Sequence, residues 1–341
     1  MGKYTLDIIV THYREPWAVG KKLFDSIAIQ ECIDFDDIGV IIVNDGEGHE
    51  LPNECFLEYP YGICQMSIPK AGVGNARNAG LDASKADWVM FCDFDDCFSS
   101  VFGLNLIFSA IYEEKYDTVW SCFTEEVVRD GQYQLVAHDR DWVFIHGKAH
   151  RRQYLVDKEI RFHPKLTIHE DVFFNMMAQS LTDPARVGGI RTPFYCWRWN
   201  DDSVVRKDRN EDYVFDTYDH LMRQRIAITE EFLKRKMMEE AMVAVVKTVV
   251  DTYYDWQQST WQKPENREKL HKAENWFAAY LKRYANYYIN ADVKTIAGMM
   301  KSCRENALKK GTFLIETITI KDWLQHIVDK AKPVPKWEQD V

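Results

Sequence analysis

The sequence predicts an α/β protein whose mainly parallel sheet is followed by a helical C-terminal region. Over residues 1–210 short apolar runs alternate with stretches of helical periodicity, whereas residues 211–341 have the pattern of helices almost throughout. Alternating strands and helices form a mainly parallel sheet with helices on both faces. A chain of 341 residues favours about two domains. We therefore expect one domain at 1–210 and a second at 211–341.

The apolar runs of the first part have the length of buried strands. The first of them, "LDIIVT", is followed by Pro16 and a segment with helical spacing, which predicts a helix beginning there. The same reasoning gives the full set of expected elements in this part: strands at 6–11, 38–45, 86–93 and 117–123, and helices at 16–30, 74–85, 101–114 and 170–181.

The second part has a different pattern. Residues 212–256 are periodic and contain neither glycine nor proline, so they are expected to be helical. The segment 257–267 interrupts this pattern, and two or three further helices are expected before residue 330. The remaining tail is expected to be loose.

Composition and charge narrow the class of protein. The net charge of −10 comes from the first 210 residues, and an acidic surface is a poor match for nucleic acid. The eight cysteines form no CxxC pair, which favours a reducing compartment. The sequence starts without a signal-peptide pattern and has no apolar stretch near the ~20 residues that span a bilayer. We expect a cytoplasmic protein without a transmembrane segment.

Three predicted strands end in polar clusters. These are Thr11-His12-Tyr13, Asn44-Asp45-Gly46 and the run from Asp93 to Asp96. In parallel sheets ligands bind outside the carboxyl ends of the strands. The clusters therefore predict a binding site at that edge of the sheet.

The most acidic cluster lies in "WVMFCDFDDCFSS", where Asp93, Asp95 and Asp96 follow a buried strand. Alone, such a run is more often a solvated turn. Hard divalent cations, however, prefer carboxylate oxygens and often take phosphate oxygens as further ligands. The motif is thus a hypothesis for a Mg²⁺ or Mn²⁺ site against a diphosphate.

Two further segments carry groups suited to the same chemistry. "KAGVGNARNAG" is a glycine-containing turn before a helix whose first turn holds Arg77, a combination suited to phosphate. Glu170 and Asp171 begin an amphipathic helix, where carboxylates are favoured by the helix dipole. They are either an ordinary helix start or a general base at a cleft.

The order and spacing of these motifs resemble the inverting family 2 glycosyltransferases with the GT-A fold. The resemblance covers about residues 5–208. The motifs that carry it are, in order, Thr11-His12-Tyr13, Asn44-Asp45-Gly46, Ala76-Arg77-Asn78, Asp93-Phe94-Asp95-Asp96, "FIHGKAHRRQYL", "IRFHPKLTIHEDVFF" and "YCWRWNDDSVVRKD".

The resemblance implies a role for each matching residue. On the donor side, it places Thr11, Tyr13 and Asp45 in the nucleoside pocket. Arg77 would contact the base or diphosphate, and Asp93 the ribose or the waters of the metal. Ser203 and Arg206 would lie in a loop that closes over the phosphates. For the metal, it makes Asp95 a ligand, with Asp93 beside it and Asp96 in support. Asp171 would be the catalytic base, and Glu170 would orient it or bind the acceptor.

One segment departs from the family pattern. Many relatives have a histidine in the closing loop as a further metal ligand, but residues 199–203 read Trp-Asn-Asp-Asp-Ser. Asn200, Asp201 or water would have to take that place. Three other residues are candidates for contact with the acceptor: His169, Trp199 and His146.

The sequence therefore predicts a metal-dependent inverting glycosyltransferase that uses a UDP-sugar and Mn²⁺ or Mg²⁺. Its acceptor could be a saccharide, a cell-surface polymer, a protein or a modified DNA base, although nucleic acid is not favoured. One alternative is an enzyme of nucleotidyl transfer to a sugar phosphate, but this sequence lacks the glycine-rich basic signature of such enzymes. Another is a non-catalytic binding protein, which the intact Asp95 and Asp171 disfavour. The C-terminal helices are expected to shape the acceptor site or form a homodimer.

Overall fold

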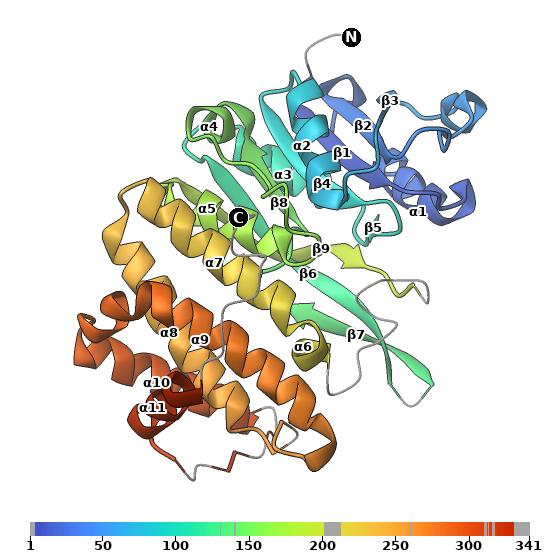
Figure 1. Cartoon of the computed structure of the whole chain (residues 1–341). Coiled ribbons are helices and arrows are strands. Elements are labelled where there is room, and N and C mark those ends of the chain that lie inside the picture. Colours follow the sequence, from blue (N-terminus) through green and yellow to red (C-terminus); the bar gives the residue numbers. More distant parts are fainter. Residues whose placement is uncertain are drawn as a thin grey trace. The chain divides into compact units, whose positions relative to one another are not determined.

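The computed structural model describes residues 4–129, 131–139, 141–200, 213–259, 261–309, 312, 314–315 and 318–330, without the side chains of residues 213, 214 and 330. Its contacts divide the chain into two compact units, Met1–Lys207 and Asp208–Val341 (Figure 1). The first unit contains the sheet, and the second is helical. The separate roles predicted for the two parts remain a prediction.

The strands of the first unit belong to one mixed sheet. In the described residues it has nine strands in the order β3-β2-β1-β4-β8-β6-β9-β5, with β7 paired to β6 beside this row. Two groups of neighbours are parallel: β3 (Gly62–Ile68), β2 (Ile38–Asp45), β1 (Leu6–His12) and β4 (Trp88–Asp93); and β6 (Thr118–Arg129) with β9 (Val187–Trp197). The strands antiparallel to their partners are β5 (Cys97–Phe98), β7 (Gln132–His138) and β8 (Lys148–Arg151). The predicted α/β class and mixed sheet are confirmed.

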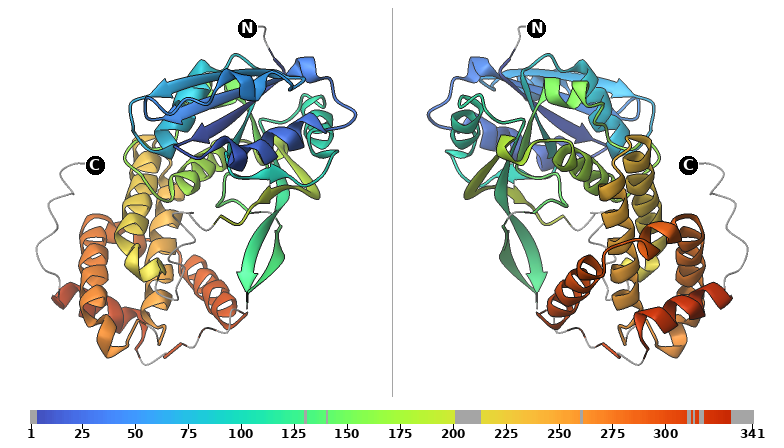
Figure 2. Two further views of the ribbon diagram at one scale, coloured as in Figure 1. Left: turned by 90° about the vertical axis from the view of Figure 1, so that its right-hand side faces the viewer. Right: turned by 90° about the vertical axis from the view of Figure 1, so that its left-hand side faces the viewer.

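Helices cover both faces of this sheet, and strand alternation explains why (Figures 1 and 2). Ile8 and Val10 of β1 pack into the same core cluster as Phe24, which belongs to helix α1 (Trp17–Ala28). Ile9 points the other way, toward α2 (Val73–Ala83). A Cβ on Gly80 of α2 would lie 2.4 Å from Cγ2 of Ile9, so this close approach requires glycine.

The remaining helices of the first unit pack on these same two faces. α3 (Gly103–Ile111) contributes Leu104 to the cluster on the α1 side. On the α2 side, Phe174 of α5 (Glu170–Ser180) lies with its ring centroid 5.4 Å from that of Phe91 on β4. Shorter helices are α4 (Arg152–Asp157) and the 3₁₀ turns Phe35–Asp37, Asn53–Phe56 and Pro184–Arg186.

Every strand expected from an apolar run is present, at β1, β2, β4 and the first half of β6. The sequence did not predict β3, β5, β7, β8 or β9. β3 is half-buried along its whole length and has no continuous apolar run, which is typical of an edge strand. β5 has two residues, too few to give a pattern.

The second unit consists of helices, as expected. Its helices are α6 (Tyr213–Asp216), α7 (Tyr218–Lys234), α8 (Met238–Trp256), α9 (Arg267–Ile289), α10 (Val293–Lys309) and α11 (Ile320–Lys330), with a 3₁₀ turn at Pro264–Asn266. α7, α8 and α9 pack side by side around fully buried residues such as Val249, Phe277 and Trp323 (Figure 1).

The helical stretch expected over 212–256 is not continuous. α7 ends at Lys234, and Lys236 adopts the left-handed conformation with φ +61°. The amide of Met237 then donates to the carbonyl of Phe232 at 2.9 Å, a helix-ending pattern that usually has glycine at the left-handed position. Because lysine stands there instead, the sequence carries no signal for the break. Across the described segments, none of the helices combines the length and the apolar character needed to cross a membrane.

Candidate active site

The carboxyl ends of β1, β2 and β4 lie side by side and bring the three predicted clusters together. Thr11 is opposite Asp93 in the β1–β4 register. His12 is opposite Asn44 in the β1–β2 register, with 2.7 Å between Nδ1 and Oδ1. The His12 side chain is buried, and its contact with Asn44 joins the ends of β1 and β2. These contacts fix the floor of the site.

Asp45 at the end of β2 holds the loop that leads into α2. Its carboxylate accepts the backbone N–H groups of Ala71 at 2.7 Å and Gly72 at 3.0 Å. Gly72 has φ +92°, a conformation that favours glycine. On the same loop the Lys70 ammonium donates to the Tyr13 hydroxyl at 2.6 Å. Tyr13 and Asp45, both predicted to line the nucleoside pocket, are thus joined to one loop.

Arg77 connects the acidic motif to the predicted base helix. Its side chain is 4% exposed, and it donates from Nη2 to Asp93 at 2.6 Å and from Nη1 to Glu170 at 2.8 Å. Burial alone would raise the pKa of Asp93, but the Arg77 guanidinium, together with the nearby His146, lowers it below its usual value. Burial raises the pKa of Glu170, opposed by Arg77. The predicted contact of Arg77 with the nucleotide remains a prediction.

The other two carboxylates of the motif have different surroundings. Asp96 is fully buried and accepts from the Tyr195 hydroxyl at 2.5 Å and the Arg198 amide at 3.0 Å. Burial, with the charges of Asp95 and Asp93, raises its pKa well above the usual range. Asp95 is half-buried, and its Oδ2 accepts from Nδ2 of the Asn200 side chain at 2.8 Å. Asp95 is therefore the more accessible of the pair, and the supporting role of Asp96 stays a prediction.

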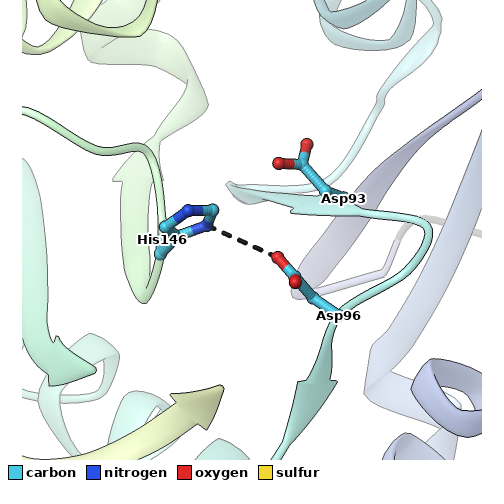
Figure 3. A group of neighbouring side chains, drawn as sticks. All are labelled: Asp93, Asp96 and His146. Carbon is cyan, nitrogen blue, oxygen red and sulfur yellow. Dashed lines mark ion pairs between the residues drawn. The ribbon is translucent and has the colours of Figure 1, made fainter. Parts of the chain in front are cut away.

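His146 lies beside Asp93 and Asp96 (Figure 3). Its Nδ1 is 3.6 Å from Oδ2 of Asp96, and one ligand atom each from Asp93, Asp96 and His146 lies within 4.8 Å of the others. The imidazole is 3% exposed, with its ring centroid 5.0 Å from that of Tyr195. The structure thus places this predicted acceptor residue with the predicted metal residues. No spacing in the sequence links His146 to Asp93; the fold brings them together.

Asp171 lies in the first turn of α5, next to Glu170. Burial and the neighbouring Glu170 carboxylate raise the pKa of Asp171 to about 8. His169 caps the helix in the left-handed conformation, with φ +65°, which is uncommon for a residue other than glycine. A carboxylate with a pKa near neutrality is suited to accept a proton.

Lys148 on β8 is a buried charged residue that the sequence did not single out. It is 1% exposed, and its ammonium donates to the carbonyl of Phe144. Asn175, one turn beyond Asp171 on α5, donates to that same carbonyl at 2.9 Å. Burial lowers the pKa of Lys148 to about 8. Lys148 and Asn175 therefore fix the segment just before His146 to the base helix.

Glu15 was also missed by the sequence analysis. Its carboxylate accepts the backbone N–H of Tyr13 at 2.6 Å, and burial raises its pKa.

Trp199, predicted near the acceptor, lines a surface pocket of about 410 Å³ with Tyr133 and Arg198. Ser203, Arg206 and Asp201 lie outside the described residues, and their predicted roles stay predictions.

The family model of glycosyl transferase family 2 matches residues 7–178, half of the chain. The chain therefore belongs to glycosyl transferase family 2, as the motifs predicted. It is similar to an uncharacterized glycosyltransferase of Haemophilus influenzae (33% identity over 93 residues, 27% of this chain and 30% of that one). It is also similar to the putative glycosyltransferase EpsH of Bacillus subtilis (23% identity over 192 residues, 50% and 55% of the two chains). The chain thus spans about a third to a half of the length of these relatives.

Among solved structures, TarS 1–349 of S. aureus has a similar fold, with a TM-score of 0.55, 17% identity, and coverage of 89% of this chain and 92% of that one. The same TarS fragment in complex with UDP gives a TM-score of 0.54 at 14% identity and the same coverage. At such identities the likeness concerns the fold, and it confirms the predicted GT-A architecture with its C-terminal helices.

Proposed function

We propose that this protein is a metal-dependent inverting glycosyltransferase that moves a sugar from a UDP-sugar to an acceptor hydroxyl. The observation that carries the proposal is the double hydrogen bond of Arg77. It holds Asp93 of the predicted metal and ribose motif and Glu170 of the predicted base helix in one buried ion-paired group. Donor chemistry and proton transfer would therefore take place at a single site. The family assignment and the UDP complex of the similarly folded TarS support this reading.

The donor set suits a Mn²⁺ or Mg²⁺ ion. Asp95, half-buried and accessible, and Asp93 would supply carboxylate oxygens, which both ions prefer. The His146 imidazole beside Asp93 and Asp96 adds a nitrogen ligand, which suits Mn²⁺ better than Mg²⁺. When bound, such a cation neutralises negative charge on the departing diphosphate.

The nucleoside end of the donor would lie against Thr11, Tyr13 and Asp45. The Tyr13 ring offers a flat face, and the Lys70 ammonium lies 4.0 Å from its centroid, which adds positive charge near the expected phosphates. Asp45 keeps the loop before α2 in place through its two amide contacts. Ser203 and Arg206 are proposed to close over the diphosphate.

Asp171 is proposed as the general base. It takes the proton of the acceptor hydroxyl while that oxygen bonds to the anomeric carbon of the sugar. The bond from this carbon to the diphosphate oxygen breaks, and UDP leaves with the bonding electrons. A single displacement of this kind inverts the configuration at the anomeric carbon. His169, which immediately precedes the base helix, is proposed to contact the acceptor.

Two substitutions separate donor binding from transfer. Asp95→Ala is expected to abolish Mn²⁺-dependent binding of UDP, measured by calorimetry. Asp171→Asn is expected to bind UDP and Mn²⁺ normally but to lose transfer by about 10²–10⁴-fold, the range of general-base catalysis. Transfer is measured as metal-dependent release of nucleotide from a panel of nucleotide sugars, with and without acceptors. Asp157→Asn, at an exposed position on α4, is the matched control and should behave as wild type. Normal transfer by Asp171→Asn would contradict the assignment of Asp171 as the general base.

A further inference from the structure

Two cysteines lie opposite each other on the paired strands β5 and β9. Cys97 is the register partner of Cys196 in this antiparallel pair, and all eight cysteines are free thiols. Opposed side chains on antiparallel strands lie on the same face, with Cβ atoms about 4.5–5.5 Å apart. The pair was not recognisable in the sequence because 98 positions separate the two residues.

The backbone spacing of this pair suits a disulfide. Opposed residues in an antiparallel ladder have Cα atoms about 4.5–5.5 Å apart. Disulfides span Cα separations of about 4.4–6.8 Å. Because a disulfide also needs its Cβ atoms about 3.5–4.5 Å apart, a bond between Cys97 and Cys196 requires rotation of the side chains and an approach of the two strands by roughly 1 Å.

The two thiols differ in access. Cys97 is half-buried, whereas Cys196 is 5% exposed. A soluble reagent therefore reaches Cys97 first, and Cys196 lies behind it as the second thiol.

The pair joins the two segments that hold the acidic motif. Cys97 directly follows Asp95 and Asp96 on the chain. Cys196 stands two residues before Arg198, whose amide donates to Asp96 and whose guanidinium donates to the carbonyl of Asp95 at 3.1 Å. A covalent bond between the cysteines would link these two segments a second time, through the paired strands β5 and β9.

We propose that Cys97 and Cys196 form a thiol–disulfide exchange site that is oxidised reversibly by small-molecule disulfides such as oxidised glutathione. The Cys97 thiolate attacks one sulfur of the small disulfide, forms a mixed disulfide and releases one thiol. The Cys196 thiolate then attacks Sγ of Cys97, the mixed disulfide breaks, and the second thiol leaves. The two protein thiols supply two electrons, and their two protons end on the two released thiols. In a reducing compartment such a bond is transient.

The test uses the full chain, treated in its native state with oxidised glutathione, alkylated under denaturing conditions and analysed by peptide mapping. In the wild type we expect a Cys97–Cys196 disulfide without bound glutathione, removed by dithiothreitol. In Cys196→Ser the second step cannot occur, so glutathione should remain on Cys97. Cys303→Ser, on α10, is the matched control and should still form the Cys97–Cys196 bond.

The wild-type result decides the proposal without relying on the folding of a variant. Wild-type Cys97 that stays a free thiol, retains glutathione or pairs with another cysteine overturns it. The same treatment in urea should not favour this pair, because the proximity comes from the fold. These outcomes are independent of sugar transfer, so they do not depend on the proposed function.

Discussion

Arg77 and Glu170 are separated by 92 residues in the chain and joined by a hydrogen bond of 2.8 Å from Nη1 to Oε1. The same guanidinium also holds Asp93. One buried cation thus faces two carboxylates that come from different motifs. Breaking a buried ion pair from one side leaves uncompensated charge, which is more costly than losing an exposed pair.

Arg77→Ala is therefore expected to lower the free energy of unfolding by about 3–5 kcal/mol. Arg161→Ala removes an exposed ion pair with Asp82 and serves as the control, with an expected loss of about 0–1 kcal/mol. Urea unfolding followed by circular dichroism measures both. Equal unfolding midpoints for the two variants would contradict the structural role of Arg77.

Tyr195→Phe removes the hydroxyl that donates to the fully buried Asp96 at 2.5 Å. A buried acceptor that loses its donor costs about 1–3 kcal/mol, and we expect that loss in the free energy of unfolding. Tyr112→Phe is the control, because the Tyr112 hydroxyl donates to Asp37 at the surface at 3.2 Å. Its effect should stay within about 0.5 kcal/mol. If both variants are equally stable, the Tyr195 hydroxyl does not stabilise the buried Asp96 carboxylate.

The pH dependence follows from Asp171. Burial and Glu170 raise its pKa to about 8, so in the protein without ligands it is protonated at neutral pH. As a base it must be ionised, and kcat/KM is expected to rise with pH and level off above about 8. The free energy of unfolding depends on pH in the opposite direction. A carboxyl group whose pKa is raised in the folded protein stabilises the fold at low pH, and this stabilisation is lost as the pH rises through about 8.

Asp171→Asn tests the assignment of that titration. The asparagine cannot ionise, so unfolding measured from pH 5 to 9 should lose this part of the pH dependence. A wild-type rate profile that is flat between pH 6 and 9 speaks against Asp171 as the group that titrates.

His146→Phe tests the nitrogen ligand proposed for the cation. The phenyl ring can keep the packing against Tyr195 and Phe144, so the fold should persist. We expect Mn²⁺ affinity to fall about tenfold or more, as for other groups at metal centres. His138→Phe is the control: His138 also stacks on an aromatic ring, that of Phe123 at 4.4 Å, but it pairs with Glu125 rather than the acidic motif. Calorimetric titration that gives the same affinity for both variants would assign the cation to the carboxylates alone.

The sequence predicted the parts of the fold that carry a strong local pattern. The buried runs at β1, β2 and β4 are continuous in apolar residues, and their polar ends mark the edge where the site lies. Edge strands such as β3 lack such a run, because one side of each contacts solvent. Lys236 ended a helix where glycine was expected, so the break between α7 and α8 had no local signal.

The site was predictable only where motifs have a fixed order. Asp93, Asp95 and Asp171 could be proposed from that order, but their neighbours could not. The contact of Arg77 with the nucleotide stays a prediction, and its contacts with two carboxylates had no signal in the sequence. Lys148 and His146 stand in the same short segment, and their surroundings depend on how β8 pairs with β4 and β6. Long-range pairing of this kind leaves no periodic trace in one sequence.

The pairing of Thr11 with Asp93 in the strand register has a consequence for insertions and deletions. Removing one residue from β1 before Ile8 would turn every following side chain of the strand to the opposite face of the sheet. Ile8 and Val10 would leave the core cluster, and Thr11 would lose its place opposite Asp93 in the same event. The residue count of β1 therefore sets the positions of both the core residues and the groups at the candidate site. A chimera with a related enzyme has to preserve that count, even where it changes every side chain in the strand.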